Sequence, residues 1–210
     1  RYGTAPFMVH YALSGPVPWS AEEARRAAVV HVGGDLGELT AAAEAGRRGT
    51  VPERPTLVVG QHSLFDPTRA PAGRHTLYAY GHVPGRYDEP DEAVADRIHA
   101  QLERFAPGFS SLVLARSFRA PWRTERENPS LVGGDLAGGS MEIDQQLVFR
   151  PAPRLCRYRT PLRGLYIAGA SVHPGPAVHG ISGRGAARAL LWDRRLPWRS
   201  GKLGAAGLDR

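Results

Sequence analysis

Short runs rich in β-branched and aromatic residues recur along the first 120 residues, and glycine or proline residues bound most of them. This pattern is typical of β-strands separated by turns. The clearest run, residues 7–13, ends at the turn signal Ser14-Gly15-Pro16. The same pattern predicts further strands over residues 56–60, 75–80 and 111–118.

Apolar side chains spaced three or four positions apart predict one long helix that opens at Pro90. Pro107-Gly108 is placed to end it. Its apolar face would consist of Val94, Ile98, Leu102 and Phe105.

Two capping signals predict shorter helices. Ser20 and Glu23 have capping-box spacing, and the apolar stretch that follows them is a candidate strand. Asp35 and Glu38 repeat this spacing, and Gly46 is placed to end the helix that they begin.

The second half of the chain has a different character. Residues 120–140 are polar and glycine-rich without a clear period, which indicates a long loop. After them, the pattern predicts a buried strand at 165–168, a glycine- and proline-rich loop at 169–183 and a helix at 184–192. Because strands and helices do not alternate regularly, we expect an α+β fold with a mostly antiparallel sheet.

Composition and charge exclude several classes of protein. Hydrophobic residues make up 42% of the 210 residues, as in ordinary globular proteins, and no apolar run approaches the roughly 18 residues that a membrane-spanning helix needs. The net charge is +7, but the basic residues are scattered and match no RNA-binding or zinc-finger pattern, so no nucleic-acid partner is expected. The single cysteine, Cys156, fits a reducing compartment, which favours a cytoplasmic location.

The candidate chemistry is concentrated in the stretch 164–183. This stretch reads as an apolar strand, a loop rich in glycine and the start of a helix. Backbone amides and a helix N-terminus at such a junction favour negative charge. Glycines also let the main chain approach a flat or phosphorylated ligand closely; they are Gly169, Gly175, Gly180 and Gly183.

The sequence Gly169-Ala170-Ser171-Val172-His173-Pro174-Gly175, followed by Val178-His179-Gly180, resembles a motif of the phytoene desaturase-like FAD-dependent oxidoreductases. In that family, a C-terminal strand ending in Gly-Ala-Ser or Gly-Asp is followed by a His-Pro-Gly type loop and a Val-x-Gly step that contact the flavin. Residues 128–135 and 147–151 resemble segments that precede the motif in bacterial members. The resemblance touches most of residues 7–192 and is strongest over 158–187.

The resemblance implies a desaturase or dehydrogenase that uses FAD and acts on an apolar, carotenoid-like substrate. Residues 1–150 would form a substrate domain with a mixed sheet and helices. Residues 151–195 would form the C-terminal strand, loop and helix of a Rossmann-like FAD-binding domain, and residues 196–210 a tail.

The resemblance also implies a set of cofactor contacts, although it names no catalytic residue. Gly169, Ala170 and Ser171 would lie near the FAD pyrophosphate and ribityl chain. The backbone from Val178 to Ile181 would lie near the pyrimidine edge of the flavin. The full set of implied contacts is Gly169, Ala170, Ser171, Gly175, Val178, Gly180 and Ile181.

The strand, G-x-G-x-x-G loop and helix of a complete dinucleotide fold have no match in the chain. Gly183-Arg184-Gly185 is the only echo, and position 188 is arginine. We therefore expect a C-terminal portion that is inactive alone and works with an N-terminal dinucleotide-binding chain. An apolar substrate and a basic surface also favour peripheral contact with membranes.

Two alternatives stay open. One is a non-catalytic partner or a degenerate remnant of such an enzyme. The other is a serine hydrolase, since Gly169-Ala170-Ser171-Val172-His173 resembles a nucleophile elbow. That elbow requires a helix directly after Ser171, and His173-Pro174 opposes one. No metal site is expected, because the histidines lack the spacing of zinc ligands.

Overall fold

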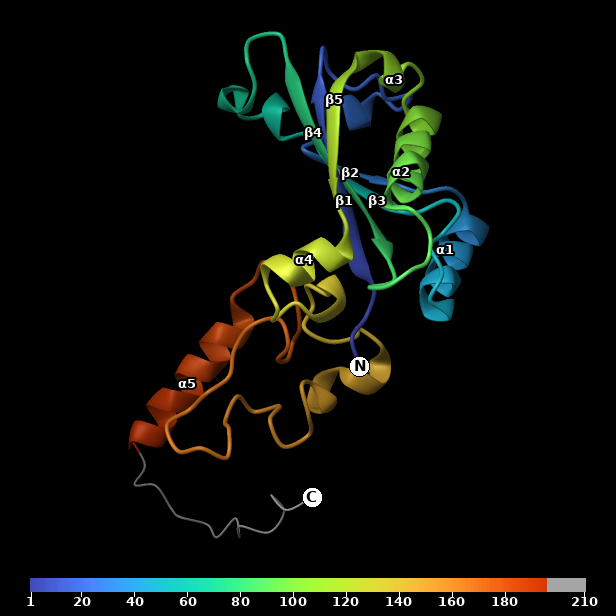
Figure 1. The fold of residues 1–210 in the computed structure, drawn as a ribbon. Coiled ribbons are helices and arrows are strands. Elements are labelled where there is room, and N and C mark those ends of the chain that lie inside the picture. Colours follow the sequence, from blue (N-terminus) through green and yellow to red (C-terminus); the bar gives the residue numbers. More distant parts are fainter. Residues whose placement is uncertain (196–210) are drawn as a thin grey trace. The chain divides into compact units, whose positions relative to one another are not determined.

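The computed structural model describes residues 1–195, which belong to two compact units, one formed by residues 1–140 and one that begins at Met141 (Figure 1). The expected tail at 196–210 lies outside the described residues.

The first unit is built on a five-stranded sheet with the order β2-β3-β4-β1-β5, in which every neighbouring pair is antiparallel. In this unit, strands form at each expected position, which confirms the α+β class with an antiparallel sheet. The strands are β1 (Ala5–Leu13), β2 (Val29–Val32), β3 (Leu57–Gly60), β4 (His75–Val83) and β5 (Val113–Arg119).

The α-helices of this unit are α1 (Leu36–Arg48), α2 (Asp91–Phe105), α3 (Phe109–Leu112) and α4 (Pro121–Glu127). Helix α2 begins directly after Pro90, as expected, and packs against β1, β2 and β4. Three residues of its expected apolar face are fully buried and the fourth, Phe105, is partly buried.

The core of the first unit lies between α2 and the sheet. The side chains of Phe7, Leu57 and Ile98 are completely buried there. Trp19 is also buried, and its indole Nε1 donates a hydrogen bond of 2.9 Å to the Gln61 side-chain oxygen. The Gln61 amide nitrogen in turn donates to two backbone carbonyls, so this buried polar group is satisfied.

The helix signals at Asp35 and Ser20 have different outcomes. The Asp35 carboxylate accepts the Glu38 amide at 2.9 Å and caps α1, as predicted. The helix continues past Gly46 and ends at Gly49, which has φ 75° and thus takes the left-handed conformation that glycine allows. The predicted capping box at Ser20 is wrong, because the chain forms only a 3-10 turn, Glu23–Arg26, without a side-chain cap.

The stretch 120–140 is not the featureless loop that the sequence predicts. Helix α4 begins with Pro121 in its first turn and carries an Arg123–Glu127 ion pair one turn apart. Further along, the buried Asp135 carboxylate accepts the backbone amides of Gly3, Ala137 and Gly139. These bonds fix the loop, because one carboxylate satisfies three amides.

The described part of the second unit has one α-helix, α5 (Ile181–Arg195), which includes the helix expected at 184–192. Short 3-10 turns, Ile143–Gln145 and Leu147–Phe149, precede it. The buried strand predicted at 165–168 is not formed: Leu165 is half exposed, and a single bridge joins Arg159 to Tyr166. A strand needs a continuous ladder of partners, and between residues 141 and 195 this segment has none beyond that bridge.

Candidate functional site

The loop that precedes α5 encloses an open hollow of about 310 Å³ within the second unit. Four of the seven predicted cofactor contacts line it, namely Gly169, Ala170, Gly175 and Gly180. The remaining lining residues are Pro176, Ala177, His179 and Ser182. Apart from His179, the wall is therefore made of backbone and small side chains, which leaves room for a ligand to approach the main chain.

The other three predicted contacts do not line this hollow. Ser171 is half buried but does not line the hollow, and the Val178 side chain is fully exposed. Ile181 is the first residue of α5, and its side chain is half exposed.

Three glycines of this loop have backbone angles that other residues rarely adopt. The φ angles are 109° at Gly169, 112° at Gly175 and 63° at Gly180. A side chain at Gly169 or Gly180 would meet no neighbouring atom, so the backbone conformation rather than space requires glycine there.

The N-terminus of α5 meets the beginning of the loop. The Gly169 amide donates to the Ser182 hydroxyl oxygen at 3.2 Å, and the Ile181 amide donates to His179 Nδ1 at 3.0 Å. The next two amides, of Ser182 and Gly183, lie in the first turn, so the helix itself offers them no acceptor. Ser182, which no sequence motif marked, holds the two ends of the loop together.

A polar cluster ties the chain before the loop to α5. Arg159 donates two hydrogen bonds, of 2.8 and 2.9 Å, to the two oxygens of the Asp193 carboxylate. The Tyr166 hydroxyl donates to the same carboxylate at 2.9 Å. The Arg159 hydrogen bonds hold the pKa of Asp193 below its usual range, so the pair stays ionised. No sequence motif marked these residues.

The packing of Tyr158 explains why position 185, in the stretch Gly183-Arg184-Gly185, is glycine. A methyl group added at Gly185 would overlap the Tyr158 ring, whose hydroxyl donates to the His173 carbonyl at 3.2 Å. Gly185 thus lets an aromatic ring lie against α5 beside the loop.

His173 lies in the loop that precedes α5. Its Nδ1 atom is buried and has no hydrogen-bond partner within residues 1–195.

The structure does not form the nucleophile elbow of a serine hydrolase. The helix that such an elbow requires does not follow Ser171, because α5 begins only at Ile181. Within the described residues, no group of three or more metal-ligating side chains occurs and no helix is long and apolar enough to cross a membrane.

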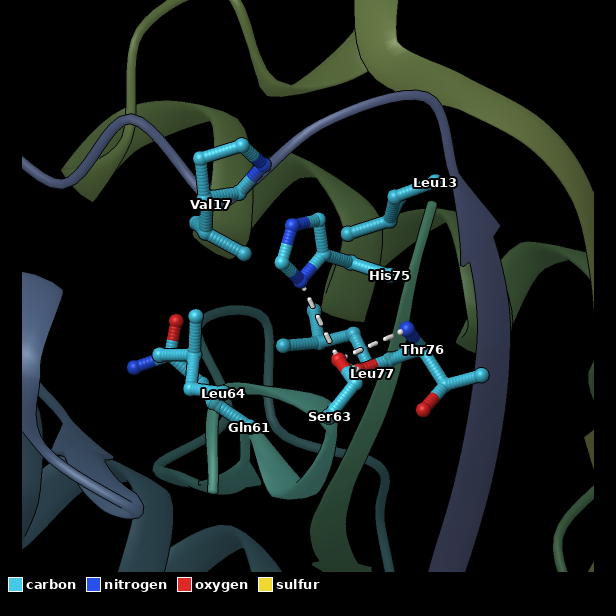
Figure 2. Close-up of a pocket in the computed structure, with 9 residues that line it drawn as sticks. Leu13, Val17, Gln61, Ser63, Leu64, His75, Thr76 and Leu77 are labelled. Atoms are coloured by element: carbon cyan, nitrogen blue, oxygen red, sulfur yellow. Dashed lines mark hydrogen bonds between the residues drawn. The ribbon is translucent and has the colours of Figure 1, made fainter. Parts of the chain in front are cut away.

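A second, much smaller cavity lies inside the first unit (Figure 2). Its volume of about 10 Å³ is room for one water molecule. Figure 2 shows Ser63 beside His75, with 3.2 Å between the hydroxyl oxygen and Nδ1. The same hydroxyl oxygen accepts the Thr76 amide at 3.1 Å. A buried hydroxyl engaged in this way, with no space for a substrate, serves the fold rather than catalysis.

The sheet face opposite α2 carries a row of aromatic rings. On β1 and β4, His10 lies 5.2 Å from Tyr78, Tyr78 lies 5.6 Å from Tyr80 and Tyr80 lies 5.7 Å from His82, measured between ring centroids. The two tyrosines are half buried and the two histidines are exposed. Partial burial lowers the pKa of His10, and the Arg119 charge lowers it further, so its imidazole is neutral near pH 7.

Comparison with characterised proteins finds related sequences over most of the chain. The chain is 37% identical to pyridine nucleotide-disulfide oxidoreductase domain-containing protein 2 of Rattus norvegicus. This match extends over 163 residues, or 74% of the chain. It is 32% identical over 148 residues, or 66% of the chain, to the neurosporene-forming phytoene desaturase of Rhodobacter capsulatus. It is 30% identical over 132 residues, or 61% of the chain, to the 4,4'-diapolycopen-4-al dehydrogenase of Metabacillus indicus.

The matched region is a minor part of each relative. It spans 28% of the rat protein, 27% of the desaturase and 26% of the dehydrogenase. No protein-family model matches the chain.

Proposed function

The chain is a relative of the phytoene desaturase-like FAD-dependent oxidoreductases, and from this premise we propose that it forms part of a flavoenzyme that oxidises an apolar, carotenoid-like substrate. The observation that carries the proposal is the coincidence of two findings. The relatives are named as an oxidoreductase-domain protein, a dehydrogenase and a desaturase. The motif suggested by the sequence forms a hollow, lined largely by backbone, at a helix N-terminus.

The residues around the hollow fit one edge of FAD. Small residues leave room for the cofactor, and the first-turn amides of Ser182 and Gly183 favour a negatively charged group. Gly169, Ala170 and Ser171 would lie along the pyrophosphate, and Val178 and Ile181 near the flavin ring. When bound, the flavin supplies the ring that accepts a hydride from the substrate. The described residues offer no acidic side chain in the hollow for the ribose, so a second dinucleotide-binding body would complete the site.

The aromatic row on β1 and β4 is the proposed contact surface for the apolar substrate. Tyr78 and Tyr80 offer flat apolar rings, which suit an extended hydrocarbon. His10 is neutral near pH 7 and can accept a proton, but we assign no catalytic base.

Flavin binding tests the proposal directly. The purified chain is mixed with FAD, with and without a candidate dinucleotide-binding chain, and its absorbance is recorded from about 350 to 500 nm after removal of free flavin. A retained flavin band supports the proposal. Its absence with every partner tried contradicts it and favours the non-catalytic remnant.

A pair of glycine variants sharpens this test. Gly180 and Gly73 both have positive φ angles, 63° and 72°, and open space where a side chain would stand. Gly180→Ala and Gly73→Ala therefore impose similar backbone strain, but only the first lies at the hollow. We expect Gly180→Ala to weaken FAD binding and Gly73→Ala to leave it unchanged. Equal losses in both would point to a general effect on folding.

Binding of a hydrophobic dye tests whether the second unit needs a partner. The second unit exposes many large apolar side chains, so the chain alone should bind a hydrophobic dye, and a dinucleotide-binding partner should suppress that binding. Absence of dye binding by the chain alone would argue against a missing partner.

Membrane contact is also part of the proposal. A net charge of +7 favours anionic lipid surfaces, where an apolar substrate would dissolve. Sedimentation with vesicles containing phosphatidylserine, but not with neutral vesicles, is the expected result.

A further inference from the structure

Arg150 is the only arginine with a fully buried side chain in the described part of the chain; just 2% of its surface is exposed. Its guanidinium donates two hydrogen bonds to the Ala170 carbonyl, from Nε at 3.1 Å and from Nη2 at 2.9 Å. Nη1 donates to the Gln145 carbonyl at 3.4 Å. A buried cation is costly unless it is well hydrogen-bonded, so this arrangement points to a defined role.

The guanidinium also lies against the middle of the loop, at Gly175. A side chain built at Gly175 would come within 3.5 Å of Arg150 Nε, and the Gly175 amide closes a turn with the Val172 carbonyl at 2.8 Å. One buried side chain therefore supports the loop at both Ala170 and Gly175.

The contact between Arg150 and the Ala170 carbonyl also sets the direction of the next backbone N–H, that of Ser171. In a trans peptide, the carbonyl and the following N–H lie in one plane and point in opposite directions. Because the Ala170 carbonyl points at the Arg150 guanidinium, the Ser171 N–H points away from it. The contact thus fixes which side of the loop presents a hydrogen-bond donor.

We infer that Arg150 is a positioning residue for ligand binding: it locks the Ala170–Ser171 peptide so that the Ser171 N–H is held ready for an anionic group, the pyrophosphate of FAD. The ligand part of this inference rests on the proposed function. Arginine suits the task because its planar fork makes two bonds to one carbonyl, whereas a lysine ammonium is a single point charge.

The test compares Arg150→Lys with Arg154→Lys in the full chain. Both keep the charge, but Arg154 is exposed, so its variant is the matched control. Far-UV circular dichroism verifies that both fold, and Arg150→Gln serves if Arg150→Lys does not. Hydrogen exchange then measures the amides of Val172 and Gly175 without ligand, and flavin fluorescence measures FAD affinity with the same partner chain throughout.

We expect Arg150→Lys to speed exchange at these two amides at least about tenfold and to weaken FAD binding by about the same factor, since each lost charged hydrogen bond changes an equilibrium by this order. Arg154→Lys should change neither. Exchange and affinity equal to those of the unsubstituted chain would overturn the inference. Absence of FAD binding by the unsubstituted chain would instead refute the proposed function, and the exchange result would still decide whether Arg150 positions the loop.

Discussion

Residues 1–140 and residues 141–195 differ in how many of their apolar side chains are buried. In the first unit, the sheet and α2 enclose a continuous core in which Phe7, Leu57 and Ile98 have no exposed surface. In the second, only Val172 and Ala189 are buried apolar residues among those described. Its exposed large apolar residues are Met141, Ile143, Leu147, Val148, Phe149, Leu162, Leu165, Val178, Ile181, Leu191 and Trp192.

This difference indicates how each unit is stabilised. Burial of apolar surface is the main favourable term in folding, and the first unit buries a core of its own. The second is held by polar contacts, such as the Arg159–Asp193 pair and the bonds from Arg150 to Ala170. Polar contacts of this kind add little net stability, which agrees with the proposal that a partner covers the apolar surface of this segment.

The largest expected effect comes from the core of the first unit. Phe7→Ala should lower the free energy of unfolding by about 3–5 kcal/mol, because it leaves a cavity beside Phe118. Val178→Ala in the second unit should change it by less than about 0.5 kcal/mol, since that side chain is exposed. Urea unfolding followed by fluorescence of the buried Trp19 measures both. Similar losses for the two variants would contradict the comparison.

The next effect concerns the buried amide of Gln61. Gln61→Leu removes the acceptor for the Trp19 indole and the donor to two carbonyls, so the unfolding free energy should fall by about 1–3 kcal/mol. The same urea titration measures it. An unchanged midpoint would mean that water replaces these bonds. The control is Gln101→Leu, which removes one bond donated to the Pro55 carbonyl and one accepted from Arg104 at 3.4 Å.

A variant in the second unit should act locally. Gly185→Ala forces the Tyr158 ring to move and should break its bond to the His173 carbonyl, at a cost of about 1 kcal/mol or more. Faster hydrogen exchange should be confined to residues 141–195. The double variant with Tyr158→Leu should recover part of the loss, and a failure to recover would show that the ring is not the cause.

The smallest effect is a pH dependence within the first unit. Hydrogen bonds to Glu103, from the Ser110 side chain and from the amides of Ser110 and Gly108, lower its pKa to about 2. A lowered pKa means that the ionised form stabilises the fold above the ordinary glutamate range and that this contribution is lost as the pH falls toward 2. Glu103→Gln should therefore have a lower melting temperature at pH 7, and the gap should shrink on acidification. A gap that is constant between pH 7 and 2.5 would exclude this cause.

Much of the first unit follows from local patterns. Runs rich in β-branched and aromatic residues predicted its strands, and the spacing of Val94, Ile98 and Leu102 predicted α2 and its buried face. These succeed because a strand or helix that covers a core must carry a matching period. The Asp35 cap was equally readable, since its bond to Glu38 spans only three residues.

The glycine loop before α5 was also predicted, and four of the seven residues assigned to the cofactor line one hollow. The sequence could not reveal Arg150, because its contact with Ala170 joins residues 20 positions apart and follows no motif. The same holds for Asp193, which Arg159 reaches across 34 positions.

The sequence by itself determined the antiparallel α+β class, the positions of α2 and of the strands in the first unit, and the motif that relates the chain to flavin-dependent oxidoreductases. The tertiary structure decided that α1 ends at Gly49, that Asp135 orders a polar loop and that residues 165–168 form no strand. The physical reason is the distance along the chain over which each interaction acts. Periodicity and capping act over a few residues, whereas strand pairing, buried hydrogen bonds and the burial of apolar surface depend on groups that only the folded chain brings together.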